Sequence, residues 1–451
     1  MKYLDLLYEG RYDELVRETF PILETDKDAE RVFLRLFLQK QTTMLLNEHT
    51  TRHDLFNAAE KGNKYAQYAI ARRIYFENEI EEAPWISRRN MKAAAEQGLP
   101  DAIAGLAMTY EYGDIGGVDR KEADRLMEQA RSLGSELAYR CEIKDWCFGH
   151  RFIAPNPRHV IELCNARIAA DEAAGIDVNG LWYYYRACAV EALEGRTNAV
   201  EDYKRSLDLG VLNAYTDLIL AFGYDEKTSS FKPSSEYFEY IRQGMAAPYG
   251  GAFYLHAVEL TYQYDSMEES FKNRDVELSA PYFDLLSKCH DTIHRQLSNA
   301  ARLGDVAAWE LLGDMYHDGS YGFQKHKKKA MVCYEEGIKQ DSASCMEKLW
   351  KMMHKHEIDK PIDFVDQVAL WGARHESKLL LAEVVIAKQE GRLSEFADEI
   401  EKYYEPIFDA PEFTLDNDED WQNTIDDLLA DPNDPNPDDY PDDDGRFDAW
   451  A

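Results

Sequence analysis

Apolar residues recur every fourth position along most of the chain, and the pattern itself returns every 36 residues. Gly62, Gly98 and Gly134 mark three successive copies, and positions 304, 340 and 376 keep the same interval. The aligned positions are Ala58, Ala94, Ala130 and Ala300 four residues before an anchor; Ala66, Ala102, Ala138, Ala214 and Ala308 four after; Ile70, Leu106, Leu218 and Leu312 eight after; and Ile74, Tyr110, Trp146, Phe222 and Tyr316 twelve after.

Steps of four place these side chains on one face of an α-helix. A glycine at the anchor, and again at Gly113, Gly149 and Gly319, suits a helix end that needs a left-handed residue. One helix hairpin cannot bury its apolar face alone, so neighbouring hairpins must stack. The pattern therefore predicts an all-α solenoid.

The pattern G-x3-A-x3-L-(G/A)-x2-Y-x2-G occurs at residues 98–113 and 304–319. It resembles the Sel1-like repeat family, a relative of the tetratricopeptide repeats. The period of 36, against about 34 for tetratricopeptide repeats, favours the Sel1-like interpretation. The resemblance implies a right-handed superhelix of helix hairpins and a scaffold or adaptor role, and some bacterial members look like immunity proteins.

We expect three parts. Residues 1–51 form an N-terminal helical cap of tetratricopeptide type, and residues 52–408 form the Sel1-like solenoid. Anchors Gly175, Gly210 and Gly250 are unevenly spaced, so residues 150–290 are expected to be irregular, with surface loops at 224–235 and 263–277. Residues 409–451 are an acidic, largely disordered tail with a short helix near 418–430.

The formal net charge is −34, and the tail contains sixteen of the acidic residues but only one base, Arg446. Such a charge repels phosphate, so nucleic-acid binding is not expected, whereas a basic protein partner is compatible with it. Seven cysteines without a C-x-x-C pair do not make a disulfide framework. With no apolar signal region and no run long enough to span a membrane, the sequence favours a cytoplasmic protein.

Candidate partner-binding residues come from two places. One is the aromatic block of Trp182, Tyr183 and Tyr185, which either fills the core or offers anchors on a binding surface. The other is the tail, in which Trp421 stands on the apolar side of the short helix. The acidic candidates in the tail are Asp438, Asp439, Asp442, Asp443 and Asp444.

Two further motifs leave alternatives open. His290 and His294 share a helix face, which fits either a solvated pair or, less commonly, a metal site of a hydrolase. The basic cluster at residues 325–329 opens the second helix of its repeat, against the helix dipole. It is either a solvated charged run or a receptor for the acidic tail or an acidic partner segment.

No nucleophile elbow, nucleotide-binding glycine pattern or zinc-spaced ligand set is present in the sequence. We therefore expect no enzymatic activity, no cofactor and no metal. The first functional hypothesis is a scaffold that binds a protein or peptide on the solenoid surface. The alternative is an immunity or inhibitor protein that neutralises a basic toxin or nucleic-acid-binding enzyme, with the acidic tail imitating phosphate charge.

Overall fold

The computed structural model describes most of the chain as helix. The described residues are 2–39, 42–43, 45–46, 49–77, 83–112, 119–150, 153–225, 228, 230–272, 280–340, 342–355, 358, 365, 368–369, 372 and 377–389. By contacts the chain divides into two units, Met1–Cys345 and Met346–Ala451. Within the described part, no helix combines the length and apolar character that a membrane crossing requires.

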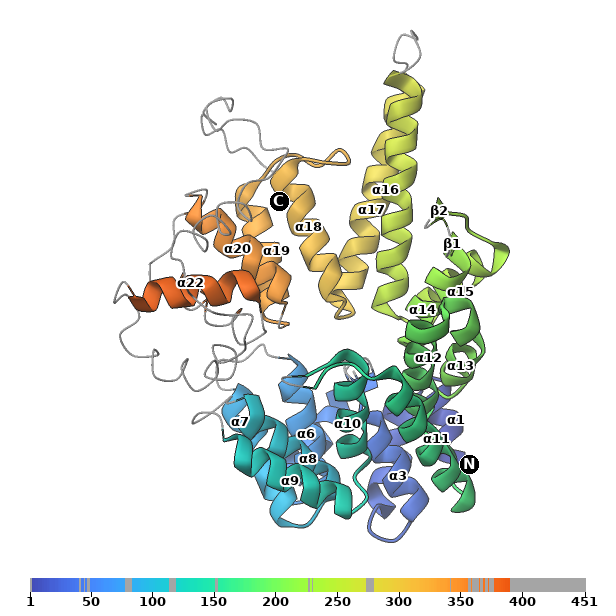
Figure 1. Ribbon diagram of the computed structural model, residues 1–451, viewed down its shortest axis with the longest axis vertical. Coiled ribbons are helices and arrows are strands. Elements are labelled where there is room, and N and C mark those ends of the chain that lie inside the picture. Colours follow the sequence, from blue (N-terminus) through green and yellow to red (C-terminus); the bar gives the residue numbers. More distant parts are fainter. Residues whose placement is uncertain are drawn as a thin grey trace. The chain divides into compact units, whose positions relative to one another are not determined.

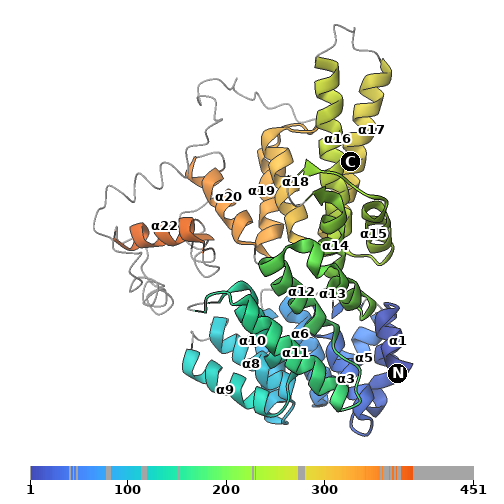
Figure 2. The ribbon, with the colours of Figure 1, turned by 45° about the vertical axis from the view of Figure 1, so that its right-hand side comes forward.

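The first unit is a succession of helix hairpins, which Figures 1 and 2 show from two directions. Its N-terminal helices are α1 (Lys2–Tyr8), α2 (Tyr12–Thr19), the 3-10 turn η1 (Phe20–Ile22), α3 (Lys27–Leu36) and α5 (His49–Glu60). The hairpins that follow are α6 (Lys64–Glu77) with α7 (Ala83–Glu96), α8 (Pro100–Tyr112) with α9 (Arg120–Ser132), α10 (Glu136–Phe148) with α11 (Pro157–Ala173), and α12 (Gly180–Glu194) with α13 (Arg196–Asp208). The unit continues with α14 (Ala214–Gly223) and α15 (Ser235–Ala246), α16 (Gly250–Lys272) and α17 (Ala280–Arg302), α18 (Val306–Asp318) and α19 (Lys327–Ile338), and the start of α20 (Ala343–His354). These hairpins confirm the all-α solenoid.

The anchor glycines end helices, as the sequence predicted. Gly62, Gly98, Gly134 and Gly304 have φ between 78° and 88°, in the left-handed region. At Gly98 the backbone N–H donates to the carbonyl of Ala95 at 2.9 Å, so the turn satisfies a carbonyl that the helix end leaves open. Gly250 differs, because it begins α16 instead of ending a helix.

The aligned apolar positions form the core. Ala102 and Ala308 are completely buried, and Leu106 and Leu312 are only 7% and 3% exposed. One cluster of buried side chains extends from Leu4 to Val211, so the N-terminal helices and the first hairpins share a continuous core.

The irregular middle differs in part from the sequence prediction. The stretch 224–235 contains two short antiparallel strands, β1 (Tyr224–Asp225) and β2 (Ser230–Phe231). The predicted loop at 263–277 is wrong up to residue 272, because α16 continues to Lys272. α16 and α17 are each 23 residues long and pack along each other, as Figure 1 shows. Packing between the two long helices keeps the polar stretch helical.

The N-terminal helices do more than cover the first repeat. Arg35 of α3 binds both carboxylate oxygens of Glu136 on α10, with the shortest contact at 2.7 Å, and donates to the carbonyl of Asp177 at 2.9 Å. Tyr65 of α6 donates to Glu30 at 2.8 Å. A methyl group at Gly210 would lie 3.0 Å from the Tyr8 ring. The segment thus contacts several successive hairpins.

The second unit is described only in part. It contains the remainder of α20 and α22 (Lys378–Gln389). The Ser377 hydroxyl donates to Glu347 at 2.6 Å, and Leu349, Trp350 and Leu380 are fully buried. The predicted tail, residues 409–451, lies outside the described residues.

Candidate functional site

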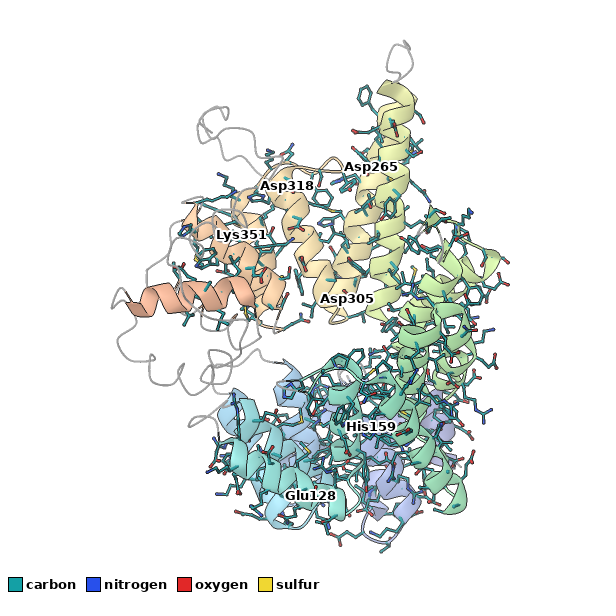
Figure 3. All side chains as sticks on the ribbon, in the orientation of Figure 1. Glu128, His159, Asp265, Asp305, Asp318 and Lys351 are labelled. Atoms are coloured by element: carbon teal, nitrogen blue, oxygen red, sulfur yellow. The ribbon has the colours of Figure 1, made fainter. Side chains whose placement is uncertain are left out.

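The candidate site is built on the repeat that follows Gly304. The Asp305 carboxylate caps α18 by accepting the backbone N–H of Ala308 at 3.1 Å, and Gly319 ends the helix at φ 72°. Figure 3 labels Asp305 and Asp318, which mark the two ends of α18. His326 caps α19 by accepting the backbone N–H of Lys329 at 3.2 Å. These caps fix where both helices begin and therefore which side chains face one another.

A groove of about 370 Å³ lies between α17, α18 and α19. Its lining is mostly apolar and aromatic on α18 and basic on α19. The lining residues are His294, Ser298, Trp309, Leu312, Tyr316, Lys328, Lys329, Val332 and Cys333.

Tyr316 is at the centre of the groove's contacts. Its hydroxyl lies 3.1 Å from His294 Nε2, and its ring centre lies 5.1 Å from the Lys329 ammonium. Burial lowers the pKa of His294, and the neighbouring His290 and Lys329 lower it further. Val332 is 49% exposed, although it is a large apolar side chain. The groove thus combines uncovered apolar surface with a basic rim.

The repeat at 98–134 provides a direct comparison, because its helices have the same register. Asp119 caps α9 by accepting the N–H of Glu122, just as His326 accepts that of Lys329. Glu122 therefore corresponds to Lys329, and Arg125 corresponds to Val332.

At these corresponding positions the first repeat is closed by its own side chains. Arg125 forms hydrogen bonds of 2.7 and 2.6 Å with Glu122. The Arg88 guanidinium lies 4.6 Å from the ring centre of Tyr110. Ile103, only 3% exposed, replaces Trp309. The groove at α17–α19 is therefore a local change on a shared framework.

Two other cavities lie in the first unit of the chain. One of about 380 Å³ lies among α8, α9 and α10, and it contains charged side chains of both signs, among them the paired His150 and Glu111. The other, of about 540 Å³, is bordered by α3 and by the turns at Gly98 and Gly134. Neither combines apolar exposure with charge of one sign, as the α17–α19 groove does.

The aromatic block predicted as a possible binding patch lies in the core. Trp182 is completely buried, and Tyr183 and Tyr185 are 7% and 4% exposed. The Trp182 indole N–H donates to Asp171 at 3.1 Å. The core interpretation is therefore correct for these three residues, and their use as binding anchors is corrected, because packing between α10, α11, α12 and α13 leaves their rings almost no surface.

The histidine pair at α17 makes contacts within the protein. His290 Nδ1 lies 3.1 Å from the carbonyl oxygen of Tyr321, and its ring is 4.5 Å from that of Phe323. Among the described residues, no group of three or more histidines, cysteines or acidic residues could hold a metal ion. The pair thus attaches α17 to the loop before α19.

The tail candidates lie outside the described residues. They are Trp421, Asp438, Asp439, Asp442, Asp443 and Asp444. The basic cluster is partly in the groove, through Lys328 and Lys329. Sequence reasoning missed Trp309 and Val332. Aligning residues 98–134 with 304–341, with one extra residue allowed in the turn before the second helix, shows both, since Trp309 then replaces Ile103 and Val332 replaces Arg125.

Two solved structures resemble the chain. One is a Sel1 repeat protein from Oxalobacter formigenes, 16% identical, with 76% of this chain and 91% of that chain covered and a TM-score of 0.31. The other is a protective antigen present in uropathogenic Escherichia coli strains that displays an SLR fold, 16% identical, with 95% and 89% covered and a TM-score of 0.32. No protein-family model matches the sequence, and no curated protein matches it. The helix hairpins that begin at Lys64, Pro100 and Glu136 are 36 residues apart, and their turns are closed by left-handed glycines, so the architecture is Sel1-like, as the sequence pattern predicted.

Proposed function

We propose that the chain is a protein-interaction scaffold that binds a protein or peptide partner in the α17–α19 groove. The observation that carries this proposal is the exposed Val332 beside Trp309 and Tyr316, since the corresponding position in the repeat at 98–134 is Arg125, which is paired with Glu122. Exposed apolar and aromatic side chains within a groove are typical of protein-binding surfaces. The hairpins that follow the N-terminal helices offer less surface to a partner, because α1–α3 already contact the turns of these hairpins.

Affinity purification of the full chain tests the proposal. We expect a stoichiometric protein partner that is retained by the unmodified chain and lost with Val332→Asp, because a carboxylate would disrupt the apolar surface. Leu193→Asp is the matched control, since Leu193 is also a large apolar helix residue and is 44% exposed. Equal recovery with both variants, or no stoichiometric partner at all, would count against the groove.

The second candidate function is inhibition of a basic toxin or nucleic-acid-binding enzyme. It is supported by the uneven charge, since residues 409–451 contain sixteen acidic residues and one base. In this proposal Asp438, Asp439 and residues 442–444 imitate phosphate groups, and Trp421 adds an apolar contact. Deleting 409–451 should weaken binding to the basic partner and flatten its salt dependence. Unchanged binding at every ionic strength would refute it.

We also propose that the protein acts in the cytoplasm. All seven cysteines are free thiols, and Cys164, Cys289, Cys333 and Cys345 are buried. Free thiols are the usual state in a reducing cytoplasm. This supports the cytoplasm as the place where the partner is met.

A further inference from the structure

We propose that the partner of the α17–α19 groove is an acidic peptide segment that inserts one large apolar side chain. This inference rests on the proposed function and adds the chemistry of the ligand. Among the described residues that line the groove, none is acidic, while Lys328 and Lys329 supply positive charge. The whole chain has 85 acidic and 51 basic residues, so this lining is a local reversal of sign.

Both lysines of the groove are located at the start of a helix. Lys328 and Lys329 are in the first turn of α19, where the helix dipole is unfavourable for cations and favourable for anions. The first turn of α9 also begins with two basic residues, Arg120 and Lys121, but its third residue is Glu122, paired with Arg125, where α19 has Lys329. A carboxylate bound at the start of α19 would interact favourably with both lysines and with the dipole.

The apolar part of the groove defines the second requirement. Trp309, Leu312 and Tyr316 supply apolar and aromatic surface from α18, and Val332 borders it from α19. The cavity of about 370 Å³ is large enough for a single leucine, phenylalanine or tryptophan side chain, and too small for a folded domain. We therefore expect the apolar side chain to enter the groove and flanking carboxylates to meet the lysines.

A peptide is favoured over a nucleic acid as the source of negative charge. A nucleic acid would carry phosphates across the surrounding surface of a chain whose net charge is −34, and repulsion there would oppose binding. A short peptide places its few carboxylates only where the lysines are. The apolar side chain of the peptide also contacts the apolar part of the groove, which a phosphate backbone would leave uncovered.

The test uses the full chain and a fluorescein-labelled peptide with a central tryptophan flanked on each side by two aspartates. Three probes are compared with it by fluorescence anisotropy at low salt. One has asparagines for the aspartates, one has alanine for the tryptophan, and one is a labelled single-stranded oligonucleotide. We expect the acidic tryptophan peptide to bind about tenfold tighter than each of the other probes, with an affinity that falls as salt is added.

Variants assign the binding to the groove. Lys329→Glu should weaken binding of the acidic peptide about tenfold, because it reverses a charge at the rim. Its helix should remain folded, since glutamate is favourable in the first turn, as at Glu122 in α9. Lys121→Glu is the control, because it makes the same charge reversal at an exposed lysine in the first turn of α9, the helix that corresponds to α19. This control should leave the affinity within about twofold.

Several results would overturn the inference. They are equal binding of the asparagine peptide, equal binding of the alanine peptide, tighter binding of the oligonucleotide, or unchanged affinity in Lys329→Glu. Affinity purification with Val332→Asp distinguishes a failure of this inference from a failure of the proposed function. If Val332→Asp abolishes partner recovery while the acidic peptide does not bind, the groove is a protein-binding site for a ligand of different chemistry.

Discussion

The repeats at 98–134 and 304–340 share their buried framework and differ on their surfaces. Ala102 and Ala308 are completely buried at the same position. The first repeat pairs surface charges with one another, as Arg125 does with Glu122, and the helix that follows it begins with Glu136, which binds Arg35 of α3. The second repeat presents a groove with an exposed Val332 and a basic rim.

This difference separates two roles of the repeat. Positions at intervals of four determine packing, so they are similar in both copies. Positions between them are free to vary, and in this chain they give one copy paired surface charges and the other a groove that is a candidate binding site.

Arg35→Ala should cause the largest loss of stability. Arg35 is only 5% exposed and binds Glu136 through both of its oxygens, so its removal leaves a shielded carboxylate without its cation. Breaking such a buried pair typically costs about 3–5 kcal/mol of unfolding free energy. Arg125→Ala is the control, because the exposed pair with Glu122 contributes only about 0.2–1 kcal/mol. Similar melting temperatures for the two variants would show that α3 is not held by this pair.

Asp101→Asn should raise the stability of the first repeat at neutral pH. Burial raises the pKa of Asp101 from 3.8 to about 6, and its Oδ1 accepts hydrogen bonds from Ser135 and from the Leu137 N–H, which an asparagine oxygen can also accept. Because the folded pKa is above the unfolded one, the protonated form stabilises the fold below pH 4, and this contribution is lost as the pH rises through about 6.

Asparagine does not ionise, so the variant should exceed the natural chain by up to about 3 kcal/mol at pH 7. The difference should shrink towards zero as the pH falls to 4. Thermal unfolding of both proteins at a series of pH values measures it. A difference that is independent of pH would contradict the raised pKa.

Gly313→Ala tests the second repeat with a smaller effect. An added methyl group would overlap the rigid ring of Tyr334, and overpacking of this kind costs about 1–3 kcal/mol. Gly105→Ala in the first repeat is the comparison. Its methyl group would meet the flexible end of Met91, which can move away, so urea unfolding should show a smaller loss. A larger loss at Gly105 would reverse the expected order.

The sequence predicted the framework because its signals are local. The interval of 36 located the turns at Gly98 and Gly304, and the spacing of four identified buried residues such as Leu312. The site was predicted only in part. The basic cluster was visible, but the exposure of Val332 depends on what three helices leave uncovered.

The predictions that were wrong or missing also concern features that depend on contacts between helices. Trp182 could face inward or outward on its helix until its neighbours were placed, and its bond to Asp171 depends on α11. The contact of Arg35 with Glu136 joins residues 101 positions apart, which no local pattern records. Residues 263–272 are polar yet helical, because α17 packs along them.

The most direct test replaces three groove residues of the second repeat with the corresponding residues of the first. In one variant of the full chain, Trp309→Ile, Lys329→Glu and Val332→Arg give the second repeat the residues of the first. Because the same three residues already fit this framework in the first repeat, the variant should keep its melting temperature within a few degrees. We predict that it binds the acidic tryptophan peptide about tenfold more weakly than the natural chain. Unchanged binding by this folded variant would contradict the claim that the α17–α19 groove is the binding site.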